Sequence, residues 1–581
     1  MVYAFSQSCW AWCYEEAVCC LYSPLNVCLA SGDLHKRDFH HYINQWGHFL
    51  IAFPQAYDIV LESLEDQQED VQAAILERRN FITQELQWHA SFIQECDLDS
   101  TAETTQHSVT VKYVNFLLAT ASGNQDMVHL EIPTPAEKLK IAAHVLSAIT
   151  PCVRVSATLA KLIKPLTRRN KRPRRFNMWI DRYSSDEFEA LTVQTEGLLD
   201  WLSNSLTDEE RKVLGEVYHQ AMKLEVEFFY SRLSVPTKLI PVSLLHNREE
   251  EHLLLFSVFD FACTAVDSLQ GLEQMTLSSA KEKSIVGLPP RPGRRPRPGN
   301  THLQMSRADL QKAWDAIVVF DKREMDKWLL KILAIPIAVG FDYDGLCKVL
   351  EQLSVIRENR ISRIIETGVL KGLSLSRMQL AGTRMNLYYG CVNFFEKVFR
   401  NEALNASVHV ISCWCEDLMR SALPGESDKL NLNGNEFDYE TGEVTRRMVL
   451  SPSAKFSYFN DAIQKYEREH GKPHATVYIG YSVEDLLCLL NADIGIVFGS
   501  DQCIRDVGGW FGVRFVPLFE GTVAKQREFF ESGYSSDCEW KGPPGTLYTV
   551  SNWLDIHALI LGCWSLMNPN LYLWVSLSLL E

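Results

Sequence analysis

Four side chains in the first 230 residues have types suited to nucleophilic chemistry. Cys152 directly follows Pro151, and because proline favours the first turn of a helix, the pair predicts a helix that begins near Cys152. A thiol at a helix N-terminus has a lowered pKa and is the better nucleophile. Glu225 lies beside the buried seam of its own predicted helix, where a carboxylate is costly unless it has a partner or a function. Tyr113 and Tyr183 offer hydroxyls from apolar stretches, although the sequence alone favours an ordinary core residue at each of the four positions.

A second set of polar side chains lies in the remaining part of the chain, near short apolar runs. The run that begins at Leu253 predicts a buried strand, which leads into a loop that carries Asp260. Ser412 ends another predicted strand, so a carboxylate and a hydroxyl follow two strands. A lysine and a further carboxylate complete the set, which in chain order is Asp260, Ser412, Lys455 and Asp485. A hydroxyl that holds an oxygen and a cation that offsets negative charge suit a phosphoryl group.

The elements that must position the first set are helices. From Ile43 to Leu64 the apolar residues recur every three or four positions, which indicates one buried helical face, and Pro54 within it predicts a kink or a break. Thr207 and Glu210 form a capping box before a further helix. Because this helical patterning is continuous, residues 1–235 predict an all-α antiparallel bundle as the first domain.

Strands that alternate with helices predict the fold of the second domain. The expected strands after the first one are Val408–Ser412, Thr476–Gly480, Asp493–Gly499 and Arg514–Leu518. This alternation is typical of an open, mostly parallel α/β sheet. We predict a linker at 236–250 and the second domain at 251–563, with its core at 251–269 and 406–563 and a largely helical cap at about 270–405.

Composition bounds the class of protein. The 581 residues are 46% hydrophobic and 22% charged, as in a soluble globular protein of two domains. The 57 Lys and Arg against 73 Asp and Glu give a net charge of −16, which disfavours nucleic acid as a partner. One basic run, Lys161–Arg175, is either a solvated loop between helices or an import or anion-binding patch.

Cysteine spacing and the N-terminal sequence indicate the compartment. The 16 cysteines include no pair of CxxC units, and neighbours such as Cys9 and Cys13 do not match zinc spacings. We therefore expect a reduced, intracellular protein. The first 35 residues contain no Lys or Arg, which argues against a signal or transit peptide and favours the cytoplasm.

Two further segments lie outside the predicted core. The Pro/Arg/Gly stretch Gly287–Asn300 predicts an exposed loop or, alternatively, a proline-motif ligand. Two apolar runs near the C-terminus, the second within the tail 564–581, are each about half the length of a membrane span. We expect a docked tail there rather than a membrane hairpin.

The second set and its strand context resemble the HAD phosphatases, the haloacid-dehalogenase-like superfamily. That family has a first motif Asp-x-Asp-x-Thr and a later motif Gly-Asp-x-x-x-Asp, and it uses Mg²⁺. Here Val258 stands at the nucleophile and Tyr481 at a magnesium ligand, and the chemistry needs both carboxylates. The resemblance therefore implies a phosphatase domain that is silent or nearly so. Asp260 and Asp485 remain as candidate metal ligands, whereas Asp267 lies too far past the strand to replace the nucleophile.

The first set lies in segments that resemble the TenA family, also called thiaminase II. The segments are 28–33, 111–123, 150–152, 179–185 and 219–225. With the HAD-like domain after it, the layout resembles the bifunctional thiamine-salvage proteins of plants, in which a TenA-like hydrolase is fused to a thiamine monophosphate phosphatase. The resemblance implies that Cys152 is the nucleophile and that Glu225 exchanges protons. It also implies that Tyr113 and Tyr183 orient the substrate, a methyl-aminopyrimidine.

One motif departs from the TenA pattern. The family's Gln-Asp-x-x-Phe/Tyr reads Gln45-Trp-Gly-His-Phe49 in this chain, so Phe49 keeps the aromatic position and Trp46 replaces the acid that grips the pyrimidine. The replacement removes a polar contact with the substrate and introduces a side chain large enough to fill part of the pocket.

Together these features predict a protein of thiamine salvage. The TenA-like domain would hydrolyse an aminopyrimidine breakdown product of thiamine to hydroxymethylpyrimidine without a cofactor, beside a silent phosphatase domain for which the family's Mg²⁺ is doubtful. The resemblance also implies a small pyrimidine or thiamine derivative as partner, self-association through the TenA-like domain, and a mitochondrial location as the alternative to the cytoplasm. Three other hypotheses stay open: a non-catalytic pseudoenzyme that binds a pyrimidine or phosphate ligand, a scaffold, and a decaying or misassembled gene copy.

Overall fold

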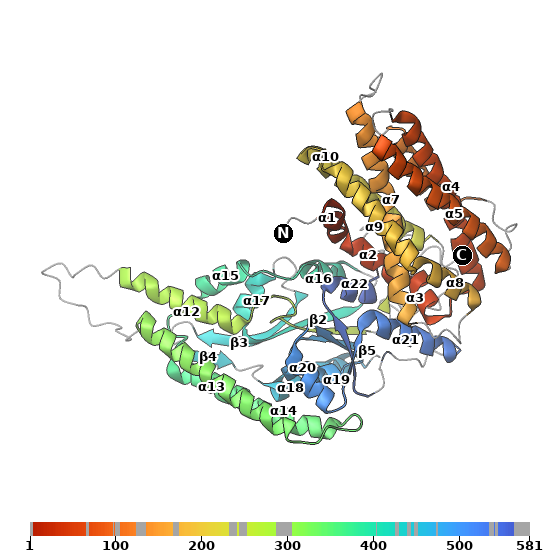
Figure 1. Ribbon diagram of the computed structural model, residues 1–581. Coiled ribbons are helices and arrows are strands. Elements are labelled where there is room, and N and C mark those ends of the chain that lie inside the picture. The colour runs from red at the N-terminus through yellow and green to blue at the C-terminus, as the bar shows by residue number, and fades with distance from the viewer. Residues whose placement is uncertain are drawn as a thin grey trace. The chain divides into compact units, whose positions relative to one another are not determined.

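The computed structural model describes residues 4–64, 69–96, 98, 105–123, 135–166, 173–231, 241–242, 252–285, 305–401, 404–423, 429–438, 443–446, 451–471, 474–533, 540 and 544–562. By its internal contacts the chain forms two compact units. The helical unit comprises Met1–Val242, Thr522–Cys538 and Ala558–Glu581, and the sheet unit comprises Ser243–Gly521 and Glu539–His557 (Figure 1).

The helical unit includes a segment that the sequence places in the second domain. Helix α21 (Leu518–Glu531) carries Gln526 and Arg527 in the part that belongs to this unit. Gln526 Nε2 donates to Asp33 Oδ2 at 2.7 Å, and Arg527 Nε donates to the carbonyl oxygen of Ser31 at 3.2 Å. These polar contacts across nearly 500 residues, which no local pattern records, join the segment to the N-terminal helices.

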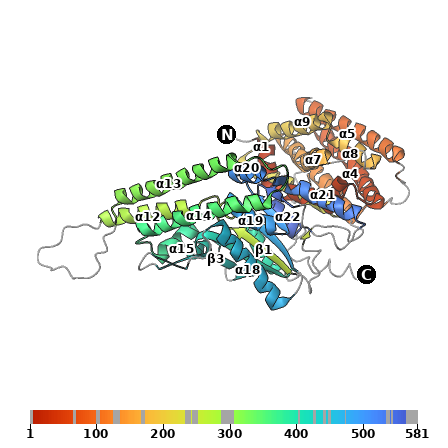
Figure 2. The same ribbon diagram turned by 90° about the horizontal axis from the view of Figure 1, so that it is seen from below.

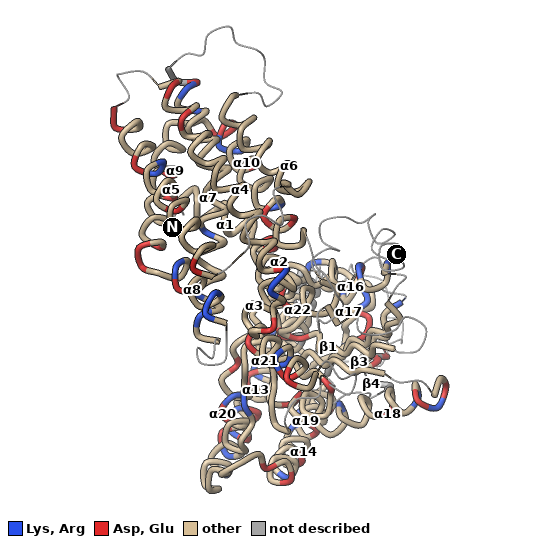
Figure 3. The backbone as a smooth tube through the Cα atoms, turned by 90° about the vertical axis from the view of Figure 1, so that its right-hand side faces the viewer, with Lys and Arg blue, Asp and Glu red and all other residues tan. Residues whose placement is uncertain are grey.

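The described part of residues 1–242 is helical, and the predicted all-α fold is confirmed. Helices α4, α5, α7, α9 and α10 run alongside one another as an elongated bundle (Figures 1 and 3). The helices are α1 (Phe5–Trp12), α2 (Tyr14–Leu21), α3 (Pro24–Ser31), α4 (Lys36–Ser63), α5 (Glu69–Glu95), α6 (Ser108–Ala121), α7 (Pro135–Ile163), the 3-10 turn η2 (Lys164–Leu166), α8 (Arg174–Tyr183), α9 (Asp186–Ser203) and α10 (Asp208–Phe229). The capping box of Thr207 and Glu210 is present at the start of α10.

Helix α7 is the centre of the bundle. It contacts α4, α6, α8, α9 and α10. Among the described residues, Glu137–Leu166 is the one helical stretch long and apolar enough to cross a membrane. However, 78% of its most apolar 18-residue segment is buried inside the protein. That degree of burial is typical of the core helix of a bundle.

The two prolines inside helices do not end them. Helix α4 continues through Pro54, and α7 continues through Pro151. The prediction that a helix begins near Cys152 is therefore wrong, because Cys152 lies in the middle of α7. An interior proline costs about 3 kcal/mol or more through a lost hydrogen bond and a clash with the previous turn. In α7 the burial of the helix against its neighbours offsets that cost.

The sheet unit is built on one eight-stranded sheet in the order β4-β3-β2-β1-β5-β6-β8-β7. All neighbours pair in parallel except β3 and β4, so the predicted, mostly parallel sheet is confirmed. The strands are β1 (His252–Val258), β2 (Ala406–Cys415), β3 (Asn431–Asp438), β4 (Glu443–Arg446), β5 (His474–Gly480), β6 (Ile494–Phe498), β7 (Arg514–Pro517) and β8 (Thr546–Val550). The sequence did not predict β3, β4 or β8. Polar β3, with the sequence Asn-Leu-Asn-Gly-Asn-Glu-Phe-Asp, has no apolar run to indicate a strand.

Helices occupy the connection between β1 and β2, as predicted. Helices α12, α13 and α14 lie alongside one another there (Figure 2). The helices of this connection are α12 (Ser268–Ile285), α13 (Arg307–Leu333), α14 (Tyr343–Thr367), α15 (Leu375–Thr383) and α16 (Cys391–Arg400). The rest of the unit adds α17 (Glu416–Ala422), α18 (Pro452–His470), the 3-10 turn η5 (Val483–Asp485), α19 (Leu486–Asn491), α20 (Gln502–Trp510) and the start of α22 (Trp553–Ile560).

Several predictions fall outside the described residues. They concern the loop Gly287–Asn300, the tail 564–581, most of the linker 236–250 and the central part of the basic run, 167–172. They stay predictions.

Candidate functional site

Three helices of the helical unit bring together the proposed nucleophile and its neighbours. Tyr113 on α6, Cys152 on α7 and Glu225 on α10 are at most 1% exposed. The Tyr113 hydroxyl donates to Glu225 Oε1 at 2.7 Å, and the Cys152 thiol is hydrogen bonded to the same carboxyl group. Three residues that the sequence analysis singled out on separate helices are therefore in contact in the structure.

Burial determines the protonation of this set. Desolvation raises the pKa of Glu225 to about 7, although the hydrogen bonds from Tyr113 and Cys152 lower it in part. Desolvation, together with the nearby Glu225 carboxyl, raises the pKa of the Cys152 thiol well above its usual value. The expected lowering by a helix N-terminus is wrong, because Cys152 lies in the middle of α7. In the resting state the thiol is therefore protonated, and the adjacent carboxyl can gain or lose a proton near neutral pH.

Trp46 on α4 packs against Tyr183 on α8, with ring centroids 5.9 Å apart. Its indole is 3% exposed, and Nε1 donates to the Tyr183 hydroxyl at 2.8 Å. The ring packs against the rings of Tyr42 and Phe228 as well, with centroids 6.3 and 6.2 Å away. The hydroxyl expected to orient a substrate therefore already accepts a hydrogen bond from the residue that replaces the family's acid.

Phe49 lies between Trp46 and Tyr113, the residue that is hydrogen bonded to Glu225. Its ring centroid lies 4.0 Å from that of Tyr113 and 6.2 Å from that of Trp46. Two buried polar atoms of the helical unit, Glu225 Oε2 and Ser156 Oγ on the helix of Cys152, have no hydrogen-bond partner among the described residues. A buried acceptor and a buried hydroxyl in this state are suited to a polar ligand, because leaving them unsatisfied is costly.

The sheet unit contains a cavity of about 190 Å³ at the carboxyl ends of its central strands. Ligands of parallel α/β sheets bind at this edge. Val258 is the last residue of β1, and Ile411 is its neighbour on β2. The cavity is lined by all six residues that the HAD resemblance singles out, which are Val258, Asp260, Ser412, Lys455, Tyr481 and Asp485.

Polar side chains that line the cavity are bonded to one another and to the backbone. Lys455 Nζ lies 2.8 Å from Asp485 Oδ1. Asp485 Oδ2 accepts from the backbone amides of Tyr481 and Ser482 at 3.0 and 2.9 Å. Asp485 thus holds the turn after β5 in place. Ser412 Oγ donates to Asp260 Oδ2 at 3.0 Å.

The aromatic side of the cavity comes from two loops. The Tyr481 ring stacks on the Phe261 ring with centroids 4.7 Å apart. Phe261 has a φ of 60°, a left-handed conformation that is uncommon for a residue with a side chain. The loop after β1 is therefore held in a strained turn against the position where the HAD family has a magnesium ligand.

The sequence analysis missed the cavity residues that come from α14. Arg357 Nη1 lies 2.9 Å from Asp321, and its Nε donates to Glu484 at 2.5 Å. Burial alone raises the pKa of Glu484, but Arg357 and Lys455 lower it to about 2. Arg360 and Asp267 also line the cavity. An Arg-x-x-Arg spacing on one helix was the available signal, and it is too common to indicate a site.

Comparisons with known proteins cover both units. The model of the TENA/THI-4/PQQC family matches residues 24–129. The mitochondrial bifunctional TH2 protein of Arabidopsis thaliana is 42% identical over 557 residues, which cover 94% of this chain and 88% of that protein. A solved TenA homologue from Pyrococcus furiosus is 18% identical and covers 39% of this chain and 98% of its own, with a TM-score of 0.34. A phospho-aspartyl intermediate analogue of phosphoserine phosphatase is 13% identical and covers 45% of this chain and 91% of its own, with a TM-score of 0.26.

The identity to the Arabidopsis protein extends across both units of the chain, so the predicted resemblance to a bifunctional plant protein is confirmed. The helical unit has the all-α fold and the family match expected of TenA, and the sheet unit has the parallel sheet and helical insertion expected of a HAD-like domain. The chain belongs to the family of the bifunctional TH2 proteins, with a TenA-type helical domain and an α/β domain built on a mostly parallel sheet.

Proposed function

We propose that this protein is a hydrolase of thiamine salvage that converts an aminopyrimidine breakdown product of thiamine to hydroxymethylpyrimidine. The observation that supports this most directly is the buried set of Tyr113, Cys152 and Glu225 in a TenA-type fold. A thiol beside a carboxyl that titrates near pH 7 is the arrangement that nucleophilic catalysis requires. The reaction needs no cofactor in this unit.

The protons of the proposed reaction pass through Glu225. The ionised carboxylate accepts the proton of the Cys152 thiol as sulfur bonds to a carbon of the electron-poor pyrimidine. The same carboxyl then gives a proton to the leaving amine, and water completes the hydrolysis and returns the thiol. The Tyr113 hydroxyl holds Glu225 Oε1, so that Oε2 stays available for the substrate.

The packing of Trp46 supports a second candidate, a pseudoenzyme that keeps the TenA fold without turnover. Trp46 both removes the family's acid and engages the Tyr183 hydroxyl, so two of the expected substrate contacts are lost at once. In a binding protein of this kind the buried oxygens of Glu225 and Ser156 would meet a ligand that is not transformed.

For the sheet unit we propose a silent phosphatase that does not hold Mg²⁺. Val258 offers no ligand atom, and the Tyr481 ring lies against Phe261. The carboxylate of Asp485 is committed to Lys455 and two backbone amides, and Asp260 already accepts from Ser412. Mg²⁺ prefers carboxylate oxygens in octahedral geometry, and these residues do not fit that requirement.

The proposed compartment and assembly follow from the family. The Arabidopsis relative is a mitochondrial protein, which supports the mitochondrion as the alternative to the cytoplasm that the N-terminal sequence predicts. We further propose that the chain self-associates through its TenA-type unit.

Replacing the nucleophile tests the proposed hydrolysis. With amino-methylpyrimidine as substrate, we expect the wild-type protein to release hydroxymethylpyrimidine slowly and Cys152→Ala to release none, because no other group can form the covalent intermediate. Chromatographic quantification of the product measures both. Cys96→Ala is the matched control, since this half-buried cysteine of the same unit lies at the end of α5 and should leave the rate unchanged. Equal turnover by wild type and Cys152→Ala would remove Cys152 from the mechanism.

The pKa of Glu225 predicts how stability depends on pH. The folded-state pKa is about 7 against 4.5 for the free carboxyl, so between these values the folded state binds more protons than the unfolded state. The free energy of unfolding should therefore fall as pH rises from about 4.5 to about 7, by at most roughly 3 kcal/mol, and be level above that range. Denaturant unfolding of Glu225→Gln should lack this component, whereas Glu227→Gln on the same helix should keep it. Identical pH profiles of wild type and Glu225→Gln would contradict the assignment.

Restoring the acid at position 46 tests whether Trp46 limits catalysis. We expect Trp46→Asp to raise kcat/KM for amino-methylpyrimidine by about tenfold or more, because it frees the Tyr183 hydroxyl and returns a hydrogen-bonding partner for the pyrimidine. Trp46→Phe is the control, since it removes the indole donor without supplying a carboxylate. If Phe and Asp give the same gain, the space and not the acid is the limiting feature.

Restoring the missing carboxylates tests the silent phosphatase. Wild-type protein should release no phosphate from thiamine monophosphate with Mg²⁺, because it lacks the nucleophile. The double substitution Val258→Asp and Tyr481→Asp should give measurable Mg²⁺-dependent release, and adding Asp260→Asn should abolish it. A well-folded double variant without activity would show that further cavity residues, such as the Lys455–Asp485 pair, also block the chemistry.

A further inference from the structure

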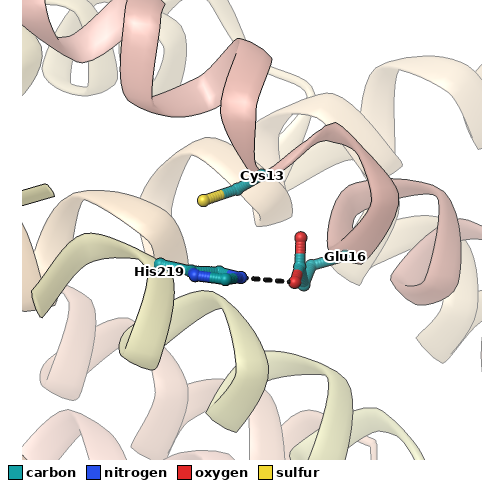
Figure 4. Close-up of side chains that lie close together, drawn as sticks. All are labelled: Cys13, Glu16 and His219. Atoms are coloured by element: carbon teal, nitrogen blue, oxygen red, sulfur yellow. Dashed lines mark hydrogen bonds and ion pairs between the residues drawn. The ribbon is translucent and has the colours of Figure 1, made fainter. Parts of the chain in front are cut away.

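Three side chains that the proposed reaction does not use meet where α1 and α2 join against α10. Cys13 lies between α1 and α2, Glu16 is in the first turn of α2, and His219 lies on α10. One ligand atom from each lies within 4.8 Å of the other two. Figure 4 shows the Cys13 sulfur beside the His219 ring, with the Glu16 carboxylate facing that ring from α2.

The local packing fixes these three groups. Glu16 Oε1 and His219 Nε2 are 2.7 Å apart, and the Trp12 ring covers the His219 ring with centroids 4.7 Å apart. Cys13 is fully buried, whereas the side chains of Glu16 and His219 are 14% and 24% exposed. The thiol of this group is therefore shielded from solvent, whereas its carboxylate and imidazole are partly accessible to water.

The chemistry of the three groups matches a borderline-soft divalent cation. Thiolate, imidazole and carboxylate are the three side-chain ligands of protein Zn²⁺, at about 2.0–2.3 Å from the metal. Around a tetrahedral ion such ligand atoms lie roughly 3.5 Å apart. Among the described residues this is the one group of three or more His, Cys, Asp or Glu side chains with such mutual proximity.

We propose that Cys13, Glu16 and His219 form a Zn²⁺ site, with water from the exposed side as the fourth ligand. The site would tie the N-terminal helices α1 and α2 to α10. Because α10 also carries Glu225, six residues after His219, the metal would hold in place the helix that presents the buried carboxylate. The proposed role is structural, and it does not depend on the proposed hydrolysis.

Binding must overcome two local costs. Burial, followed by the Glu16 carboxylate, raises the pKa of the Cys13 thiol, so a proton leaves the sulfur when the metal binds. Lys223, one turn after His219 on α10, acts on the thiol in the opposite sense and is a competing positive charge. The thiolate and the carboxylate together bring two negative charges to the ion, which offsets this repulsion.

The experiment uses the full-length protein, reduced with a phosphine and stripped of metal. It is titrated with Zn²⁺ against a chromophoric chelator and, separately, with Co²⁺. We expect wild type to bind one more equivalent of Zn²⁺ than Cys13→Ala or His219→Ala, and its Co²⁺ complex to show a thiolate-to-metal charge-transfer band that Cys13→Ala lacks. Zn²⁺ should raise the Tm of wild type and leave the Tm of the two variants unchanged.

Cys9→Ala is the matched control, because Cys9 is a buried cysteine one turn earlier that does not belong to the group. It should keep the extra equivalent and the band, which separates the site from background binding by the 16 cysteines of the chain. If Cys13→Ala fails to fold by circular dichroism, Glu16→Gln replaces it and should weaken Zn²⁺ binding about tenfold or more. The same stoichiometry and affinity in wild type and in the folded ligand variants would overturn the proposal.

Discussion

The proposed chemistry of the helical unit depends on the burial of one carboxylate, that of Glu225. A carboxyl group taken out of water must find hydrogen bonds or keep its proton, and Glu225 does both through Tyr113, Cys152 and a pKa of about 7. Since these partners come from α6 and α7, three helices must pack with their polar groups in register. The same requirement produces the chemistry, because a carboxyl that can gain or lose a proton near neutral pH beside a thiol is a proton acceptor for that thiol.

The sheet unit meets the same requirement in a different way. Its buried Asp485 is neutralised by Lys455 and held by the amides of the turn after β5. Removing one member of a buried ion pair is strongly destabilising, whereas replacing an exposed or unpaired carboxylate is not. Val258 and Tyr481 line the same cavity, in which Lys455 is paired with the carboxylates of Glu484 and Asp485. In the proposed silent phosphatase, this same pairing occupies the Asp485 carboxylate that a metal would need.

Features that follow from periodicity were predictable, and features that depend on long-range packing were not. The helical face that begins at Ile43, the capping box at Thr207 and the central parallel strands all follow from local pattern. The helix start predicted at Pro151 was wrong because α7 packs against several helices, and this tertiary burial overrides the local preference of proline for a helix start. The contact of Arg357 on α14 with Glu484 and the group formed by Cys13 and His219 could not be predicted, because each joins residues more than 100 positions apart in the chain.

The two units differ in which positions of the family motifs carry another residue in this chain. In the sheet unit the residue at the proposed nucleophile position is Val258, and binding energy does not replace a nucleophile that forms the covalent bond. In the helical unit the proposed nucleophile Cys152 and the proposed proton carrier Glu225 are present, and in the proposed reaction Trp46 would affect how a substrate is held. A lost contact of that kind lowers the rate by the free energy it contributed in the transition state, and other contacts can restore it. On the proposed function, a substrate that fits beside the indole would be turned over in the helical unit without any change to its reacting groups, whereas phosphatase activity in the sheet unit would require new side chains.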